Sequence, residues 1–186
     1  MNTGILIGFA GAKGSGKDTA ASELINEYGF KHWAFAGPLK EACGAMFHLS
    51  QEQLHGHLKE TPDPRWFGCT PRKIFQYVGT ELFRDQLDQI MPGLGNDVHI
   101  HSFKIWYQEH KNENIVVTDV RFPNEVEAIH NLGGKVIRIN RQTTGTEDGH
   151  ASEQSFLLKV DYDVSNNGSI EELHNGVLRA LNQIYV

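Results

Sequence analysis

A glycine-rich segment between a short apolar run and a helical pattern constrains the fold of this chain more than any other feature. Residues 8–19 read GFAGAKGSGKDT, and the apolar residues 5–7 stand directly before them. Gly11, Gly16 and Lys17 have the spacing G-x-x-x-x-G-K of a P-loop, in which glycines let the backbone wrap an anion and its N–H groups face phosphates. The segment therefore predicts a buried strand, a phosphate-binding turn and a helix whose positive end faces the same anion.

The P-loop pattern predicts a set of contacts to a nucleoside triphosphate. Lys17 is expected to follow the β- and γ-phosphates as a mobile positive charge. The candidate ATP-binding residues of the loop are Gly11, Ala12, Lys13, Gly14, Ser15, Gly16, Lys17, Asp18 and Thr19.

The residue after the lysine departs from this pattern. Asp18 stands where a Ser or Thr hydroxyl usually holds magnesium, and Thr19 follows one place later. A carboxylate here either orients the waters of a magnesium ion or the acceptor phosphate, or is only a favourable charge at a helix N-terminus. The residues themselves leave both interpretations open.

Composition limits the partners of the chain. Its 186 residues suit one domain with a continuous core. The 17 basic and 23 acidic residues give a net charge of −6, which argues against a nucleic-acid partner held by the overall field. The two cysteines are too few for a disulfide scaffold. No apolar run approaches about 18 residues and no signal-peptide pattern opens the chain, so we expect a cytoplasmic protein without a membrane partner.

Strand and helix patterns alternate along most of the chain. Strands are predicted at 5–9, 32–36, 114–120, 135–140 and 160–164, and helices at 17–28, 39–47, 123–133 and after 169. The stretch 50–106 has no clear strand but contains a helix opened by Thr70-Pro71, and 141–152 is typical of a mobile polar loop. This order predicts an α/β fold of three layers, with a parallel sheet between helices and ligands at the carboxyl ends of the strands.

Several basic residues stand at strand or helix ends that are expected to meet at the edge of the P-loop: Lys40, Arg72, Arg84 and Arg121. Two more, Arg138 and Arg141, flank the predicted mobile loop. Phosphoryl transfer needs positive charge on the transferred group and on the acceptor phosphate, and arginine binds phosphate oxygens in pairs. Each residue alone could equally be a solvated surface charge. Arg121 is favoured as functional because it follows Asp119 at the end of a buried strand.

Two further groups of residues have more than one interpretation. Asp119 ends a buried strand, where a carboxylate holds magnesium directly or through water, or only caps the following helix. Phe75 or Tyr77 stacks on a base, or belongs to the core, as aromatic residues at helical spacing more often do. The ten histidines include His-x-His pairs, but a helix separates i and i+2, so zinc is not expected.

With these motifs the chain resembles the deoxynucleoside monophosphate kinases of bacteriophages, a P-loop family of the nucleoside monophosphate kinase type. The resemblance covers most of the chain and rests on GAKGSGKDT at 11–19, FAGPLK at 35–40, TPRKIFQYVGTELFRD at 70–85, TDVRFPNE at 118–125 and HASE at 150–153. Aspartate after the P-loop lysine is also found in animal-type phosphomevalonate kinases, which share a GPLK segment. GTELFRD and RFPNE favour the deoxynucleotide kinases.

The resemblance implies a single P-loop kinase domain that transfers phosphate from ATP, with Mg²⁺, to a deoxynucleoside monophosphate. Its core would be 1–37 and 107–186, its helical acceptor-binding part about 38–106 and its mobile lid about 141–153. Oligomeric state is open, with a homodimer as one option, and the host cytoplasm is the expected location if the chain is phage-encoded.

The resemblance also implies a role for each matched residue. Lys17, Asp18 and Arg121 would be catalytic, Arg138 and Asn167 would join the P-loop on ATP, and Arg141 would belong to the lid. Asp18 and Asp119 would hold the metal, directly or through water. The acceptor would contact Lys40, Arg72, Phe75, Gln76, Thr80, Arg84, Arg121 and Glu153. Asn166 or Asn167 would lie near the adenine, unless this segment only turns and caps the last helix.

Two other functions remain open from the sequence. One is a kinase of another small phosphorylated acceptor, such as phosphomevalonate or dephospho-coenzyme A. The other is a P-loop nucleotide-binding module without catalysis, which usually carries Ser or Thr after the lysine.

Overall fold

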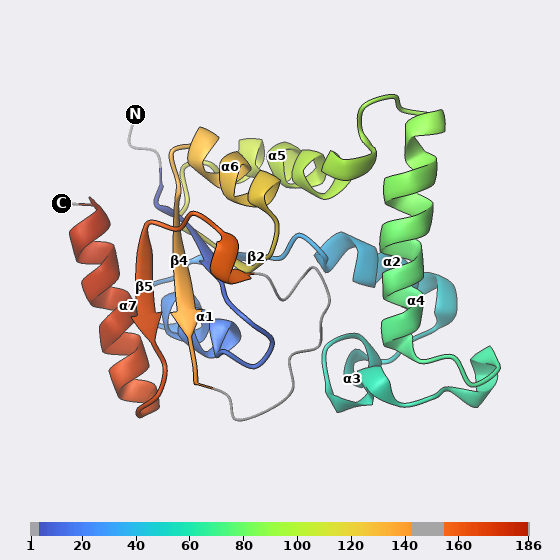
Figure 1. Cartoon of the computed structure of the whole chain (residues 1–186), viewed down its shortest axis with the longest axis horizontal. Helices are drawn as coiled ribbons and strands as arrows, with labels where there is room; N and C mark the ends of the chain where they lie inside the picture. Colours follow the sequence, from blue (N-terminus) through green and yellow to red (C-terminus); the bar gives the residue numbers. More distant parts are fainter. Residues whose placement is uncertain (1–3, 143–154, 186) are drawn as a thin grey trace. The chain divides into compact units, whose positions relative to one another are not determined.

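The computed structural model describes residues 4–142 and 155–185 (Figure 1). Contacts divide the chain into a sheet unit, Met1–Ala34 with Phe103–Val186, and a helical unit, Phe35–Ser102. One of the two boundaries, between residues 102 and 103, falls within the helix α5 (Val98–His110).

The sheet unit contains five strands that are all parallel, in the order β2-β3-β1-β4-β5. The strands are β1 (Leu6–Ala10), β2 (Lys31–Trp33), β3 (Ile115–Val120), β4 (Lys135–Asn140) and β5 (Tyr162–Ser165). Every residue of β1 is buried, as expected for a central strand of a parallel sheet covered on both faces. The predicted α/β fold with a parallel sheet is confirmed.

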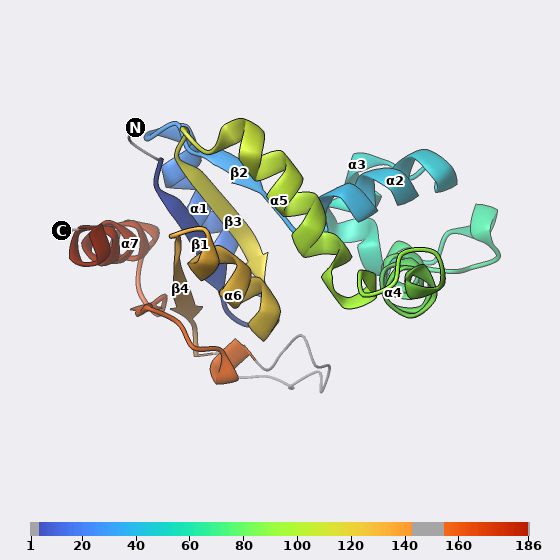
Figure 2. The same cartoon turned by 90° about the horizontal axis from the view of Figure 1, so that it is seen from above.

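Helices cover both faces of this sheet (Figure 2). On one face α1 (Lys17–Asn26) and α7 (Ile170–Tyr185) share a core that includes Phe9, Leu24 and Val177. On the other face α6 (Pro123–Asn131) packs on β1 and β4, and the Tyr107 hydroxyl of α5 donates to the carbonyl oxygen of Leu132 at 3.5 Å. Each large apolar side chain buried in these layers contributes about 1.5–3 kcal/mol to stability.

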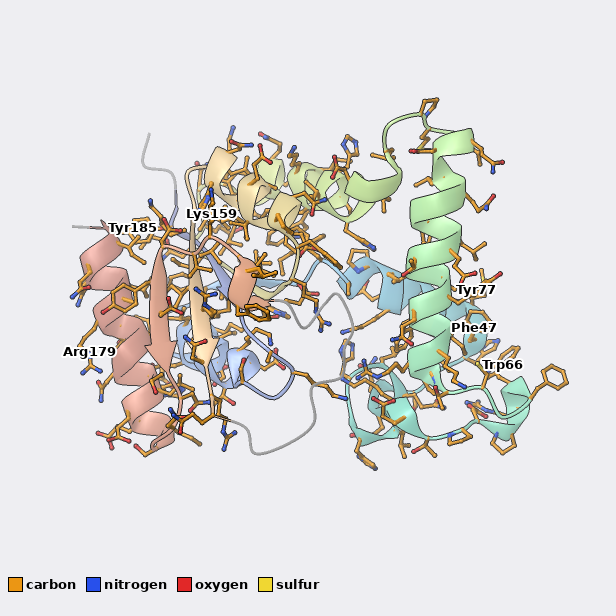
Figure 3. All side chains as sticks on the ribbon, in the orientation of Figure 1. Phe47, Trp66, Tyr77, Lys159, Arg179 and Tyr185 are labelled. Carbon is orange, nitrogen blue, oxygen red and sulfur yellow. The ribbon has the colours of Figure 1, made fainter. Side chains whose placement is uncertain are left out.

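The helical unit contains α2 (Gly37–Phe47), α3 (Gln51–Leu54) and α4 (Pro71–Tyr77), which continues as a π-helix over Val78–Gln86. Short 3₁₀ turns lie at His57–Glu60, Pro64–Trp66, Leu87–Gln89 and Gly95–Asp97. Leu39, Cys43 and Ile74 form its core, and Phe47 meets Trp66 edge to face with ring centroids 5.1 Å apart (Figure 3). The strandless helical region predicted from the sequence is therefore found.

Asp63 holds together the turn that precedes α4. Its buried carboxylate accepts hydrogen bonds from Gln53 Nε2 at 2.8 Å and from Arg65 Nη2 at 2.6 Å. The Arg65 side chain, followed by Gln53, holds the pKa of Asp63 well below its usual range. The cluster fixes a loop in which Phe67 has a left-handed backbone, with φ of 55°, and a fully exposed side chain.

The largest difference from the predicted boundaries is at the end of β2, and α5 has bounds that the sequence does not predict. The strand expected at 32–36 ends at Trp33, because Ala36 already has a helical backbone and α2 begins at Gly37, next to Pro38. The sequence pattern gives no bounds for α5 within the strandless stretch, although Ile100, Phe103 and Tyr107 are buried along one side of this helix.

We expect Gly8→Ala to destabilise the protein, because a methyl group at this position would lie 2.6 Å from Ile129 Cδ1 and 2.9 Å from Val120 Cγ2. Overpacking of this kind costs about 1–3 kcal/mol, and each kcal/mol lowers Tm by about 2–4 °C at this chain length. Thermal unfolding checks this, with Gly8→Val as a larger step in the same direction. An unchanged Tm for both variants would contradict the tight packing of α6 on β1.

Candidate functional site

The P-loop leaves the carboxyl end of β1 and wraps into the start of α1. Positive φ angles at Gly11 (142°), Gly14 (76°) and Gly16 (99°) produce the curl, and such angles favour glycine. The Ser15 N–H donates to the carbonyl oxygen of Ala12 at 3.1 Å, which closes the turn inside the loop. At Gly11 a Cβ would also lie 2.5 Å from the carbonyl oxygen of Ile139 in β4, so the loop is packed against the sheet.

Lys17 and the first turn of α1 lie at the end of this loop. Lys17 Nζ donates to the carbonyl oxygens of Gly11 and Ala12, both at 2.8 Å. The helix α1 begins after Gly16, which has no side chain to cap it, so the first turn presents backbone N–H groups suited to an anion. Asp18 in this turn is exposed and Thr19 is half-buried.

The loop between β5 and α7 borders the P-loop. Asn166 Nδ2 donates to the carbonyl oxygen of Ser15 at 2.8 Å, whereas Asn167 Oδ1 accepts from the backbone N–H of Gln142 at 2.8 Å. Beside Asn167 the surface is hollowed by a cavity of about 410 Å³, which is also lined by Ser165, Gly168, Glu172, Asn175 and Arg179. The Asn166 contact was missed from the sequence, where Asn166-Asn167-Gly168-Ser169 indicated only a turn and the neighbourhood of a base.

The carboxyl end of β3 reaches the same edge of the sheet, since Val120 pairs with Ala10 just before the P-loop. Asp119 is half-buried there, and Arg121 is exposed. Buried Glu125 fixes the turn, because its Oε2 accepts from the N–H groups of Arg121 at 2.7 Å and Phe122 at 3.0 Å. Within residues 4–142 and 155–185 the Arg121 guanidinium forms no ion pair, so its charge faces solvent at this edge.

Arg138 lies on β4 opposite Ala10, and a carboxylate of β5 holds its side chain. Arg138 Nε donates to Asp163 Oδ1 at 2.7 Å, and Nη1 donates to the carbonyl oxygen of Phe156 at 2.7 Å. The Arg138 side chain, followed by Asn140, holds the pKa of Asp163 below its ordinary value. Arg141 is exposed just beyond β4, while Glu153 and most of the predicted lid lie outside the described residues.

The acceptor-site candidates lie in the helical unit, on α2 and on α4 with its π-helical continuation. The helices are adjacent, since Leu39 packs with Ile74 and a Cβ at Gly79 would lie 2.7 Å from Leu39 Cδ2. Lys40 follows Leu39 and is half-buried, whereas Gln76 and Thr80 are exposed.

Two of these candidates already have partners within the helical unit. Arg72 Nε forms a close ion pair with Glu60 Oε1. Phe75 packs, partly buried, against the core of Leu39, Cys43 and Ile74, whereas Tyr77 is 54% exposed. The side chain of Arg84 lies outside the described part of the chain.

A magnesium ion fits the carboxylates at the P-loop edge only with help from other ligands. In the described residues no three His, Cys, Asp or Glu side chains are grouped as a metal site. Asp18 and Asp119 offer oxygen donors of the kind Mg²⁺ prefers, and this ion usually keeps several waters and binds substrate phosphates.

Residues 4–142 and 155–185 contain no helix that is both long and apolar enough to cross a bilayer.

Comparison with known proteins places the chain among nucleotide kinases. A family model described as deoxynucleotide monophosphate kinase matches residues 63–177. A protein of Acanthamoeba polyphaga mimivirus, named as a candidate deoxynucleotide monophosphate kinase, is 49% identical over 182 residues, which cover 94% of each chain. The deoxynucleotide monophosphate kinase of Enterobacteria phage T4 is 23% identical and aligns with 95% of this chain and 98% of its own.

Among solved structures, a shikimate kinase from Aquifex aeolicus superposes with a TM-score of 0.50 at 16% identity, over 96% of this chain and 97% of its own. This similarity supports the P-loop kinase fold alone.

We expect Asp163→Asn to remove part of the acid dependence of stability. The pKa of Asp163 is lowered in the folded chain, so its contribution is fully present above the unfolded pKa of about 3.9 and is lost as pH falls through the lower folded value. The side chain is 52% exposed, so solvent screening limits the effect to about 1 kcal/mol or less. Urea unfolding of both proteins from roughly pH 2.5 to 6, a range that spans the titration of this carboxyl, measures the difference in their free energies of unfolding. A difference between wild type and variant that does not shrink toward low pH would contradict it.

Proposed function

The chain belongs to the deoxynucleotide monophosphate kinase family, and we propose that it transfers the γ-phosphate of ATP to a deoxynucleoside monophosphate with the help of Mg²⁺. An oxygen of the acceptor phosphate would bond to the γ-phosphorus as the bond to the β,γ-bridging oxygen breaks, giving ADP and a deoxynucleoside diphosphate. The observation that carries this proposal is the P-loop curl with Lys17 at its mouth, at the same sheet edge as Arg121.

The donor site would use backbone and side chains of the sheet unit. N–H groups of the P-loop would bind the ATP phosphates while Lys17 leaves its carbonyl partners to follow the transferred group. Arg121, with its charge facing solvent, would stabilise the charge shared between donor and acceptor phosphates. Asn167 and the cavity beside it would lie on the base side, and Arg138 would contribute positive charge through a side chain held by Asp163.

Magnesium would be held mainly by ATP phosphate oxygens and water. Asp18 and Asp119 would hold the ion directly or through those waters, since Asp18 is exposed and Asp119 is only half-buried. When bound, the ion supplies charge neutralisation between the β- and γ-phosphates.

In the helical unit, residues of α2 and α4 would bind the acceptor. Lys40 and Arg72 would contact the acceptor phosphate, with Arg72 exchanging its Glu60 partner for phosphate oxygens. Arg84, Phe75, Gln76, Thr80 and Glu153 complete the proposed acceptor set, and Arg141 belongs to the proposed lid. A homodimer and an action in the host cytoplasm stay predictions, the latter supported by the viral origin of the relatives.

We expect acceptor-dependent ADP formation with at least one deoxynucleoside monophosphate, and its loss in Lys17→Ala, because the transferred phosphate then lacks its mobile charge. A coupled assay with ATP and a panel of deoxynucleoside and nucleoside monophosphates, phosphomevalonate and dephospho-coenzyme A measures this. Lys159→Ala is the matched control, since Lys159 is exposed and outside the proposed site (Figure 3).

The panel also separates the alternatives. Turnover with phosphomevalonate or dephospho-coenzyme A alone would replace the proposed acceptor by another phosphorylated one. Nucleotide binding without turnover of any acceptor would leave a non-catalytic module.

We expect Arg72→Ala to raise the acceptor KM by about 10- to 150-fold with little change in the ATP KM, because a charge-assisted hydrogen bond is worth about 1.5–3 kcal/mol. Steady-state kinetics with each substrate varied in turn checks this. Lys73→Ala, an exposed neighbour on α4, controls for a general loss of charge. An unchanged acceptor KM in Arg72→Ala would remove Arg72 from the acceptor site.

A further inference from the structure

The carbonyl group of Ser15 is held by a side chain that comes from outside the P-loop. Asn166, just beyond β5, donates from Nδ2 to the Ser15 oxygen at 2.8 Å across 151 residues of sequence. The position of Asn166 is itself fixed by the sheet, because its backbone N–H donates to the carbonyl oxygen of Asn140 at 2.7 Å. We propose that Asn166 is a positioning residue that fixes the Ser15–Gly16 peptide so that the Gly16 N–H faces the phosphate site.

The reason lies in the geometry of a trans peptide. The carbonyl and the following N–H of one planar unit point in opposite directions, so a bond that fixes the Ser15 carbonyl also fixes the Gly16 N–H. No cis peptide occurs in the described residues, so this relation applies here. Because Asn166 holds the carbonyl on the side of the β5–α7 loop, the Gly16 N–H is directed away from that loop.

Glycine at position 16 makes such a restraint necessary. Gly16 has a φ of 99°, and glycine adopts positive and negative φ about equally readily, so this peptide could rotate at low cost without a partner. The preceding peptide is already fixed inside the loop by the bond from Ser15 N–H to Ala12. The contact also leaves no space for a side chain at Gly16, since a Cβ there would collide with Asn166 Nδ2.

The neighbouring asparagine has a different role in the structure. Asn167 bonds to Gln142 and Ser165, and it lines the cavity on the proposed base side. Asn166 instead contacts the P-loop backbone, so its effect should concern phosphates and not the base. This inference rests on the proposed donor site, and it adds a residue that acts on ATP through the loop.

The test compares wild type with Asn166→Asp, which keeps the shape of the side chain but replaces the donor by an acceptor. We expect the Kd of a fluorescent ADP analogue and the ATP KM to rise about 10-fold or more. The Ki of inorganic tripolyphosphate against that analogue should rise by a similar factor, because this probe has phosphates but no base. The acceptor KM should stay within about twofold.

Two further variants keep the result interpretable. Asn166→Ala removes the donor without adding charge and should give the same phosphate-selective loss. Asn131→Asp makes the same chemical change at an exposed residue at the end of α6 and should bind all three probes as wild type does.

Either of two results would overturn the inference while the proposed function stands: unchanged ADP and tripolyphosphate affinity in both Asn166 variants, or weakened ADP with unchanged tripolyphosphate, which would assign Asn166 to the base. A wild-type protein that binds neither ADP nor ATP would instead overturn the proposed function, and the inference with it.

Discussion

The parallel pairing of β1 between β3 and β4 is the constraint on which the rest of the site depends. This pairing brings the carboxyl ends of three strands to one edge, so the P-loop, Arg121 and Arg138 start from adjacent backbone positions. It also buries β1 on both faces, which requires apolar or very small residues along its length and helices on each side. The proposed anion site therefore depends on the same parallel pairing that buries the central strand.

Carboxylates fix the side chains of two candidate arginines and the backbone of a third. Asp163 holds Arg138 and Glu60 holds Arg72, while Glu125 binds the backbone beside Arg121 and leaves its guanidinium facing solvent. A phosphate that recruits Arg72 must compete with a carboxylate, whereas one that recruits Arg121 has no such competitor among the described residues. Arginines that look alike in the sequence therefore differ in the structure, since some form ion pairs and Arg121 forms none within the described residues.

The parts of the fold that were predictable are those with a local cause. The apolar run 5–7, the glycines after it and Pro38, Pro71 and Pro123 at helix starts are signals read from adjacent residues. The short β2 and the limits of α5 were not predictable in the same way, because neighbouring elements decide where each ends. The amide of Asn166 and the partner of Arg72 depend on residues distant in sequence or on one rotamer, so no spacing rule contains them. The roles assigned from the family resemblance remain predictions.

Gly8 couples the interior of the sheet to the chemistry at its edge. Because this residue has no side chain, α6 can approach β1 closely, and the first turn of α6 carries the glutamate that shapes the backbone of Arg121. A side chain at position 8 would push α6 away from β1 and so displace Arg121. A substitution at position 8 is therefore expected to change two properties together, the thermal stability of the sheet unit and the placement of Arg121.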